Sequence, residues 1–433
     1  MLCDGRVVCG CADPYGHRVL GDARASSIED IWTNSAISQL RVDLNAGGSN
    51  FCGDCPLKLP LKRDEKPPAR SLDAGRRPGR MFIECTAACN ISCHQACCAP
   101  ETGITRTRQA GMLDFDLFRR VIDEVGPTLT RIDFFNYGEA FLHKRAVEMC
   151  EYIKSRFPHI YLYTSTNGLA FTETQARRLA HSGTDEVTFS IDGASQDSYE
   201  RYRRRGHFDV AIANLRAMSD EKRRSGLDLP FLNWRYILFT WNDSDAEMNL
   251  ARRIAADIGV DRLCWELTDH PEDGYSRRFV QDSADLKAIR REVWDHNNLG
   301  NAIPGATPSA RIDVRTIVRG LPLIVRAGRT LDVKTRVHNL STRPFPARAT
   351  YGRRLVRLGA QLRRSDGVLI NRDFARADLP DTIAAGANAK VTVRFPAIDE
   401  PGRFSIKFDL VCEGVDWFER CGSETTTRTL WVR

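Results

Sequence analysis

The sequence lacks the long apolar segment and the leader that mark membrane and secreted proteins. No run approaches the roughly 18 consecutive apolar residues that a membrane-spanning helix needs. Residues 1–5 do not form a signal peptide, so we expect a cytoplasmic chain without a membrane span. Internal repeats and long low-complexity tracts are also missing from the sequence.

The sequence also lacks a concentrated charge of one sign. Its net charge of +7 is modest for 433 residues, and its arginines are scattered rather than gathered in a stripe. The composition therefore does not favour nucleic acid as a partner. A hydrophobic content of 42% and a charged content of 27% are those of an ordinary globular protein. The length allows about two to four domains.

Cysteine is the residue type that stands out. There are 14 cysteines, and without a secretion signal they indicate a reducing compartment and metal ligation rather than a disulfide framework. Five lie in residues 1–55 and five in residues 85–98. We interpret the others as buried small hydrophobic residues; they are Cys150, Cys264, Cys412 and Cys421.

The second group of cysteines places a thiol at every fourth position. These are Cys85, Cys89, Cys93 and Cys97, with Cys98 directly after the last. Cysteines this close cannot all pair in disulfides without severe strain. Thiolates are ligands of both zinc sites and iron–sulfur clusters, so the spacing alone predicts a metal site and leaves the metal open.

The chain divides where its composition changes. Residues 1–60 are rich in cysteine and glycine, and residues 61–80 are basic and contain proline, as a linker does. From residue 81 to about residue 269, apolar runs alternate with amphipathic stretches. Strands are predicted at 81–84, 131–135, 160–164, 186–190 and 234–239, and helices at 115–124, 144–157, 173–182, 210–223 and 246–259. This alternation is typical of an α/β fold with a parallel sheet, open or closed into a barrel.

The last part of the chain has a different pattern. After a polar stretch near 270–305, apolar and polar residues alternate in several segments, at 312–314, 331–337, 391–395 and 404–410. Turn residues such as Asp366-Gly367 and Pro401-Gly402 separate several of these segments. The pattern predicts an all-β C-terminal sandwich at 306–433.

The closely spaced cysteines resemble the cluster loop of radical S-adenosylmethionine (SAM) enzymes. In that family, cysteines spaced CxxxCxxC directly after a first strand ligate three irons of a 4Fe–4S cluster, and the fourth iron binds SAM. Cys89 and Cys93 match the first two positions, but the third would fall at Ala96, where the chain continues with Cys97 and Cys98. The resemblance implies Cys89, Cys93 and Cys97 as cluster ligands, with Cys98 as the alternative to Cys97.

Further motifs resemble the family in the same order, each at the carboxyl end of a predicted strand. They are Asn136-Tyr137-Gly138-Glu139, Thr166-Asn167-Gly168, Ser190-Ile191-Asp192-Gly193 and the later Arg203. The carboxyl ends of parallel strands are where a barrel builds its site, and an arginine fork suits a carboxylate. The resemblance implies a partial (β/α)6-type parallel barrel, the radical SAM core, at 81–300. The SAM contacts that it implies are Asn136, Gly138, Glu139, Thr166, Asn167, Ser190, Asp192 and Arg203.

Residues 1–60 resemble the SPASM domain, which binds an auxiliary 4Fe–4S cluster. The likeness rests on the cysteines, on Leu20-Gly21-Asp22 and on the pair Ile31-Trp32. It implies a second cluster held by Cys9, Cys11, Cys52 and Cys55, with Cys3 as an alternate. A small zinc ribbon is the competing interpretation. In the family this domain follows the barrel, so either upstream sequence is missing here or the order is reversed.

The C-terminal sandwich weakly resembles immunoglobulin-like modules attached to bacterial polysaccharide-assembly and glycan-modifying proteins. The likeness rests on segments such as Val356-Arg357-Leu358-Gly359 and on Trp417-Phe418. It implies a carbohydrate- or partner-binding role. The two aromatic residues either form a sugar-stacking platform or belong to the core.

The resemblance to radical SAM enzymes also implies a reaction. A reduced cluster cleaves SAM to methionine and a 5′-deoxyadenosyl radical, which abstracts hydrogen from a peptide, natural-product or glycan-linked substrate. A reducing partner such as flavodoxin or ferredoxin is implied as well.

We identify no catalytic residue; the candidates for substrate contact are Asn136, Tyr137, Trp265, Glu266, Thr268, Asp269 and His270. His94 is interpreted as a solvated loop residue. The competing hypothesis is a non-catalytic, metal-stabilised barrel that binds a partner through its β-sandwich.

Overall fold

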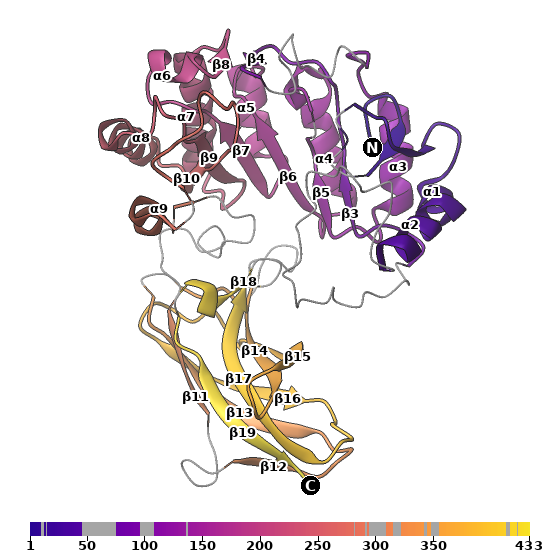
Figure 1. Cartoon of the computed structure of the whole chain (residues 1–433), viewed down its shortest axis with the longest axis vertical. Helices are drawn as coiled ribbons and strands as arrows, with labels where there is room; N and C mark the ends of the chain where they lie inside the picture. Colours follow the sequence, from indigo (N-terminus) through magenta and orange to yellow (C-terminus); the bar gives the residue numbers. More distant parts are fainter. Residues whose placement is uncertain are drawn as a thin grey trace. The chain divides into compact units, whose positions relative to one another are not determined.

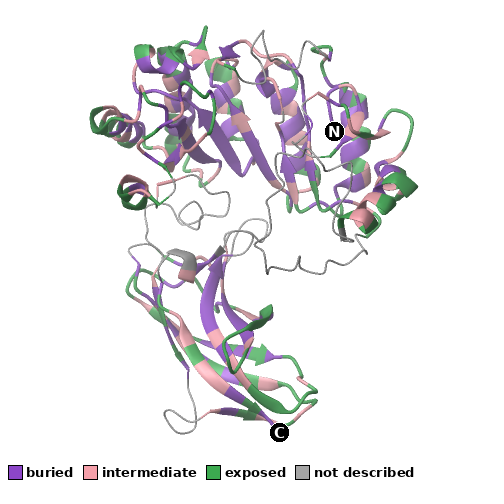
Figure 2. Cartoon of the chain, viewed as in Figure 1, coloured by how far each residue is buried: buried purple, intermediate pink, exposed green. Residues whose placement is uncertain are grey.

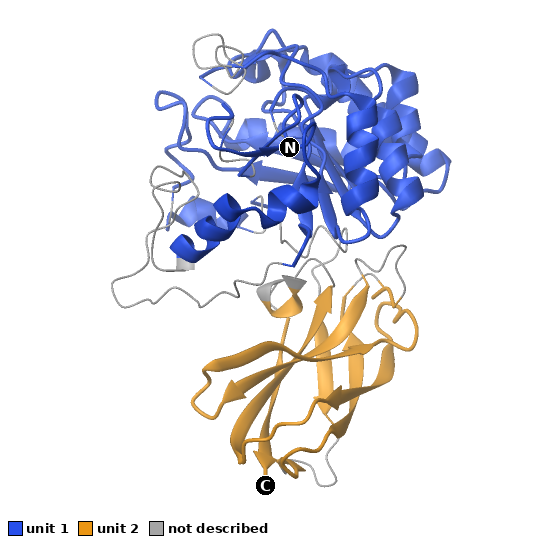
Figure 3. Ribbon diagram, turned by 90° about the vertical axis from the view of Figure 1, so that its right-hand side faces the viewer, with its two compact units in different colours: residues 1–293 blue, residues 294–433 orange. Residues whose placement is uncertain are grey.

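The computed structural model divides the chain into two compact units, Met1–Val293 and Trp294–Arg433 (Figure 3). The structure describes residues 1–9, 13, 15–45, 75–95, 108–135, 137–280, 282–290, 292–293, 309–314, 322–341, 344–347, 355–412, 416–421 and 423–433. In this part of the chain, no helix is both long enough and apolar enough to cross a membrane.

The first unit is built on a six-stranded parallel sheet (Figure 1). Its strands are β3 (Arg80–Phe82), β5 (Arg131–Asp133), β6 (Tyr161–Thr166), β7 (Glu186–Ser190), β9 (Phe231–Ile237) and β10 (Arg262–Glu266). They lie side by side in their order along the chain, and every neighbouring pair is parallel. Within the described residues the edge strands β3 and β10 do not pair with each other, so the barrel does not close. The predicted parallel α/β fold is confirmed in this open form.

Helices connect successive strands of this sheet. They are α3 (Phe115–Val125), η4 (Ala140–Leu142), α4 (Ala146–Arg156), α5 (Glu173–Ala180), α6 (Gln196–Glu200), α7 (Phe208–Arg224) and α8 (Asp245–Ile258), and α9 (Ala284–Ile289) follows the last strand. Side-chain caps fix the first turns of several of these helices. Asp114 accepts the N–H of Leu117 at the start of α3, and Thr172 forms a capping box at the start of α5. These caps satisfy backbone groups that the first turn leaves free.

The two faces of the sheet differ in chemistry. Register partners in a parallel sheet share a face, and successive residues alternate between faces. One face is apolar and packs with the helices in a single core, mostly without exposure (Figure 2); it includes Ile83, Ile132, Phe134, Leu162, Val187, Phe189, Leu232, Trp234 and Trp265. The other face is polar and includes Tyr163, Ser165, Glu186, Thr188, Ser190, Asn233, Arg235, Cys264 and Glu266. The polar face is the one that is available for chemistry at the carboxyl ends of the strands.

The N-terminal residues belong to the same unit and lie beside α3 and β3 (Figure 1). They form the antiparallel strands β1 (Arg6–Val8) and β2 (Val19–Asp22) and the helices α1 (Ile28–Thr33) and α2 (Ser35–Asn45). The carboxylate of Glu124 in α3 accepts the first N–H groups of α1, from Ile28 at 3.0 Å and Glu29 at 2.8 Å. A carboxylate at a helix N-terminus also stabilises the helix dipole, so α3 holds α1 in place.

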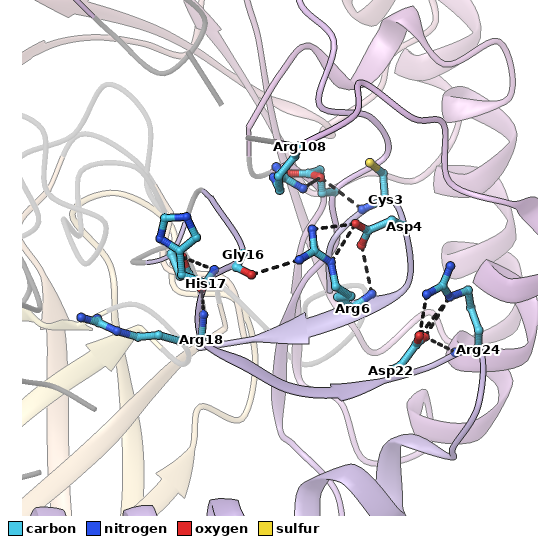
Figure 4. A network of polar contacts seen from close by, with 11 residues as sticks. Cys3, Asp4, Arg6, Gly16, His17, Arg18, Asp22, Arg24 and Arg108 are labelled. Carbon is cyan, nitrogen blue, oxygen red and sulfur yellow. Dashed lines mark hydrogen bonds and ion pairs between the residues drawn. The ribbon is translucent and has the colours of Figure 1, made fainter. Parts of the chain in front are cut away.

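Polar contacts fix the turns of this N-terminal segment (Figure 4). The Arg6 guanidinium reaches the Asp4 carboxylate at 2.9 Å and the Gly16 carbonyl at 3.0 Å. Next to them, the N–H of Cys3 donates to Glu84 at 3.1 Å, and Arg108 forms a buried, two-fold contact with the same carboxylate at 2.9 and 2.8 Å. The first residues are therefore bound to the end of the first sheet strand.

The second unit is all-β, as predicted. One sheet has the order β11 (Ala310–Val314), β13 (Leu331–Asn339), β16 (Asn388–Phe395). The other has the order β12 (Leu323–Val325), β19 (Thr426–Val432), β17 (Gly402–Cys412), β14 (Val356–Arg364), β15 (Leu369–Asp378), and β18 (Asp416–Trp417) pairs with β17. Side chains from both sheets form one apolar core. The likeness to immunoglobulin-like modules stays a prediction.

The two aromatic residues singled out in this unit are core residues. Phe418, in the short helix η7 (Phe418–Cys421), is fully buried against Phe345, with ring centres 5.2 Å apart. Trp417 is 3% exposed, and the Arg376 guanidinium lies 4.3 Å above its ring. Neither ring presents an open stacking face, so the core interpretation holds.

Candidate active site

The cluster loop follows β3 and is anchored from both sides. Its residues Ser92–Cys93 form the short strand β4, which pairs antiparallel with β8 (Arg203–Arg204), so that Cys93 lies opposite Arg203. The N–H of His94 donates to the Tyr202 carbonyl at 2.9 Å. Cys93 is 7% exposed and Cys89 is partly buried. The loop cysteines therefore lie against the connection between α6 and α7.

Arg203 reaches both a carboxylate and a loop thiol. Its Nε lies 2.5 Å from Oδ2 of Asp192, and its Nη1 lies 3.5 Å from Sγ of Cys93. Asp192 is fully buried, and its Oδ1 accepts the N–H of Ile237 at 2.7 Å. Burial opposes the Arg203 charge, but Asp192 and Cys93 outweigh it and raise the pKa of the guanidinium. Arg203 is thus a fixed cation beside the loop.

Burial raises the pKa of the Cys93 thiol, and the Arg203 guanidinium opposes that shift. A metal ligand must lose its proton, and a cation beside the sulfur favours the thiolate. Arg203 therefore supports the thiolate form that a metal needs at Cys93.

Glu139 connects the loop after β5 to the end of β6. It is 3% exposed, and it accepts the hydroxyl of Thr166 at 2.9 Å and the N–H of Asn167 at 2.7 Å. The N–H of Phe141 donates to the same carboxylate at 3.3 Å. Burial raises the pKa of Glu139, while the donors on Asn167 and Thr166 lower it. In this structure the carboxylate positions two strand ends; its contact with the SAM ammonium stays a prediction.

Gly138 allows the junction between the loop after β5 and the end of β6 to lie close to the cluster loop. Its φ is +76°, and a Cβ there would meet the Thr86 carbonyl at 2.5 Å and the Ala88 carbonyl at 2.6 Å. The N–H of Glu139 donates to the same Ala88 carbonyl at 2.8 Å. Only glycine combines this backbone conformation with this approach.

Asn167, at the end of β6, contacts the cluster loop directly. Its side-chain amide donates to Asn90 at 2.7 Å and lies 3.8 Å from Sγ of Cys89. Three predicted motifs therefore converge on the loop: Glu139 and Asn167 reach it from the ends of β5 and β6, and Arg203 reaches it from β8.

Ser190 begins a row of polar contacts on the polar face of the sheet. Its hydroxyl lies 3.2 Å from that of Ser165 and accepts Nη2 of Arg235 at 2.9 Å. Arg235 in turn lies 3.0 Å from Glu266. The row crosses β6, β7, β9 and β10 at their carboxyl ends. Sequence reasoning missed Arg235; its signal was a charged residue within the apolar strand 234–239.

Other candidates are placed differently. Trp265 lies on the apolar face, and its indole N–H donates to Glu292 at 2.7 Å, so it does not share a face with Ser190 and Arg235. Register is the reason, because one residue along a strand changes the face. Thr268, Asp269 and His270 contact one another in an exposed loop. The prediction that they touch a substrate gains no support from these contacts.

His94 is half-buried rather than fully solvated, with Nε2 at 3.8 Å from Asp273. Tyr137 is also half-buried. Several predicted site residues lie outside the described residues: Asn136, Cys97, Cys98, Cys11, Cys52 and Cys55.

The predicted N-terminal ligands are described only in part. Cys9 follows β1 and is exposed. Cys3 is buried beside Glu84, and burial together with that carboxylate raises the pKa of its thiol to about 12. Cys85 lies in the main apolar core of the unit, whereas Cys93 belongs to a separate small apolar cluster against which Cys89 packs. In the described part of the chain, no three metal-binding side chains gather, so both ligand sets stay predictions. An amide and a guanidinium directed at two loop sulfurs nevertheless fit an anionic, thiolate-bound group.

Comparison with known proteins identifies these regions. Residues 83–247 match the family model described as the Radical SAM superfamily, and residues 1–56 match SPASM, an iron–sulfur cluster-binding domain. A radical SAM domain implies a 4Fe–4S cluster and SAM, and a SPASM domain implies a further iron–sulfur cluster.

Curated relatives align over part of their length. The chain is 32% identical over 114 residues to the tungsten-containing aldehyde ferredoxin oxidoreductase cofactor-modifying protein of Pyrococcus furiosus, covering 26% of this chain and 30% of that protein. It is 29% identical over 129 residues to the GTP 3′,8-cyclase of Desulforamulus reducens, covering 30% and 39%. It is 30% identical over 155 residues to the mycofactocin maturase MftC of Mycolicibacterium smegmatis, covering 35% and 36%. The aligned part is thus well under half of each relative.

Among solved structures, Streptococcus suis SuiB bound to S-adenosylmethionine aligns with a TM-score of 0.39 and 12% identity, covering 49% of this chain and 46% of that one. Two of these relatives bear the names of enzymes. Two stretches of the chain thus match known families: residues 83–247 match the Radical SAM superfamily, and residues 1–56 match the SPASM iron–sulfur cluster-binding domain.

Proposed function

We propose that the chain holds a 4Fe–4S cluster through Cys89, Cys93 and Cys97, cleaves SAM reductively and abstracts hydrogen from a peptide, natural-product or glycan-linked substrate. When bound, the reduced cluster supplies the electron that converts SAM to methionine and a 5′-deoxyadenosyl radical. The observation that carries this proposal is the convergence of Glu139, Asn167 and Arg203 on one loop.

The proposed SAM contacts come from the strand-end motifs and from Arg203. They are Asn136, Gly138, Glu139, Thr166, Asn167, Ser190, Asp192 and Arg203. The Arg203 guanidinium can bind the SAM carboxylate in addition to the Asp192 carboxylate, since its fork offers several N–H donors. The Glu139 carboxylate suits the SAM ammonium.

The substrate side of the site is proposed to include Arg235 and Glu266. Their ion pair is partly exposed on the polar face, next to Ser190. A paired guanidinium and carboxylate offer both donors and acceptors to a polar substrate group. The relatives are named for different reactions, a cofactor modification, a cyclisation and a maturation, so the substrate class is part of the proposal.

The N-terminal segment is proposed to hold the second cluster through Cys9, Cys11, Cys52 and Cys55. The match to an iron–sulfur domain favours iron over zinc. A flavodoxin or ferredoxin is the proposed source of electrons.

Anaerobic reconstitution of the full chain with iron and sulfide tests the proposal. With reductant and SAM, we expect 5′-deoxyadenosine and methionine in equal amounts, since cleavage of one SAM gives one of each. A reconstituted chain that holds iron but forms neither product would refute the proposal.

A further inference from the structure

The two described loop thiols accept side-chain N–H groups from two different parts of the fold. Nη1 of Arg203 lies 3.5 Å from Sγ of Cys93, and Nδ2 of Asn167 lies 3.8 Å from Sγ of Cys89. By contrast, the buried thiol of Cys264 is the donor, directed at Oδ1 of Asn233 at 3.3 Å. The surroundings of Cys89 and Cys93 thus favour sulfur as an acceptor, which is the role of a thiolate or a cluster sulfur.

The Arg203 guanidinium is held rigidly in this orientation. Asp192 holds Nε at 2.5 Å and is itself held by the N–H of Ile237. The side-chain amide of Asn242 donates to the Asp192 carbonyl at 3.1 Å, and the backbone of Arg203 pairs with that of Cys93. A donor fixed from both ends stabilises charge on the sulfur with little reorganisation.

Tyr199 supplies an independent observation. Its side chain is fully buried, and among the described residues its hydroxyl has no hydrogen-bond partner. Burial raises its pKa, and the charged groups that act on it are Arg203, Asp192, Cys93 and Cys89. Leaving a buried hydroxyl without a partner is unfavourable, so this hydroxyl indicates an acceptor that the described residues do not supply.

We propose that Arg203, together with Asn167 and Tyr199, sets the reduction potential of the core cluster by donating hydrogen bonds to its sulfur atoms. Hydrogen bonds to cluster sulfurs and nearby positive charge stabilise the reduced state, which carries one more electron. The inference rests on the proposed function only in requiring that this loop holds the cluster. Arg203 acts here before SAM binds, which separates this role from the expected contact with the SAM carboxylate.

A redox titration of the reconstituted full chain, followed by electron paramagnetic resonance without SAM, tests this role. At the potential that reduces half of the wild-type cluster, we expect Arg203→Gln to lower the reduced-to-oxidised ratio about tenfold, a shift of about 59 mV to lower potential. Arg203→Lys keeps the charge but loses the fork, so its shift is smaller. Tyr199→Phe and Asn167→Ala each remove one neutral donor and shift the potential in the same direction, by less. Arg201→Gln makes the same charge change at an exposed position of the same connection and leaves the potential unchanged.

Two results obtained with the variants would overturn the inference. One is an Arg203→Gln cluster with the potential of the wild type and of Arg201→Gln. The other is loss of the cluster from both Arg203 variants but not from Arg201→Gln, which would make Arg203 a purely structural residue. A wild-type chain that holds the cluster but does not cleave SAM would refute the proposed function and leave this titration valid. A wild-type chain that binds no iron would overturn both.

Discussion

At the residue scale, the junction between the loop after β5 and the cluster loop depends on a glycine and a buried carboxylate. Gly138 allows the close approach, and Glu139 then holds Thr166 and Asn167 beside the loop. Asn167 in turn contacts Asn90 and approaches Cys89. A change at either residue should therefore act on the loop cysteines through backbone position.

We expect Gly138→Ala to impair cluster loading. An alanine at a positive φ is unfavourable by about 1–2 kcal/mol, and its Cβ would also displace the Thr86 and Ala88 carbonyls. Gly226→Ala is the matched control, because its φ is +62° but no atom lies within 4 Å of the added Cβ. Iron content after reconstitution is the measurement, and equal loading of the two variants would contradict the expectation.

The motif residues could be predicted from sequence because each follows a recognisable strand. Glu139, Asn167 and Arg203 all contact the loop that follows β3, while their contacts with SAM stay predictions. Arg235 could not be singled out in the same way, because its role depends on which strand lies beside β7. The face of Trp265 was missed because it depends on a one-residue register that an apolar strand does not specify.

At the element scale, polar contacts and a shared apolar core hold the N-terminal segment against the parallel-sheet part of the first unit. Glu124 caps α1, while the buried Glu84 binds both the backbone of Cys3 and the Arg108 guanidinium. Neither contact is visible in the sequence, because the partners lie more than 90 residues apart for Glu124 and 81 apart for Cys3. The strands and helices themselves were predictable, since their apolar spacing is local.

Glu124→Gln should loosen α1 without affecting the sheet. The variant loses one acceptor oxygen and the charge at the helix N-terminus, and a cap of this kind is worth about 0.5–2 kcal/mol. Hydrogen exchange of the α1 amides should accelerate by about 2-fold to about 30-fold. Asp123→Asn is the control, because that neighbouring carboxylate contacts Tyr152 and not α1. Unchanged exchange in α1 would count against the capping role.

In the second unit, Asp409 anchors the short helix η7 to β17. Its carboxylate accepts the N–H of Glu419 at 2.9 Å and that of Leu410 at 2.8 Å. Burial, reinforced by the Glu419 carboxylate, raises the pKa of Asp409 to about 7 from the ordinary value of 3.8. The folded state therefore binds a proton more tightly than the unfolded state.

This shift predicts that the second unit loses stability as the pH rises. The contribution is fully present below about pH 4 and is lost as the pH rises through about 7. Its size is a few kcal/mol at most, since one pKa unit corresponds to about 1.4 kcal/mol. Pulse proteolysis in urea, with detection of fragments from the second unit, measures the change in stability. The two conditions are pH 4.5, just above the ordinary pKa, and pH 8, about one unit above the pKa in the folded state. Asp409→Asn cannot ionise and should remove this dependence; a variant that keeps the wild-type slope would disprove the assignment.

At the scale of the whole molecule, three sequence patterns lie in one compact unit. The residues of the cysteine ladder, of the strand-end motifs and of the N-terminal cysteine group all belong to the first unit, and the all-β unit follows it in the chain. The fold class and the order of the sheet strands follow from local patterns and from parallel topology. The proposed substrate contacts Arg235 and Glu266 do not follow from these patterns, because their row of polar contacts forms only when four strands lie side by side.

The production of 5′-deoxyadenosine by matched cysteine variants tests the central claim most directly. Cys93→Ala removes a proposed ligand, whereas Cys150→Ala removes a thiol buried in the helical core. With reductant and SAM under anaerobic conditions, we predict 5′-deoxyadenosine from the wild type and from Cys150→Ala, and none above background from Cys93→Ala. Equal amounts from Cys93→Ala and the wild type would contradict the claim that this loop holds the cluster that cleaves SAM.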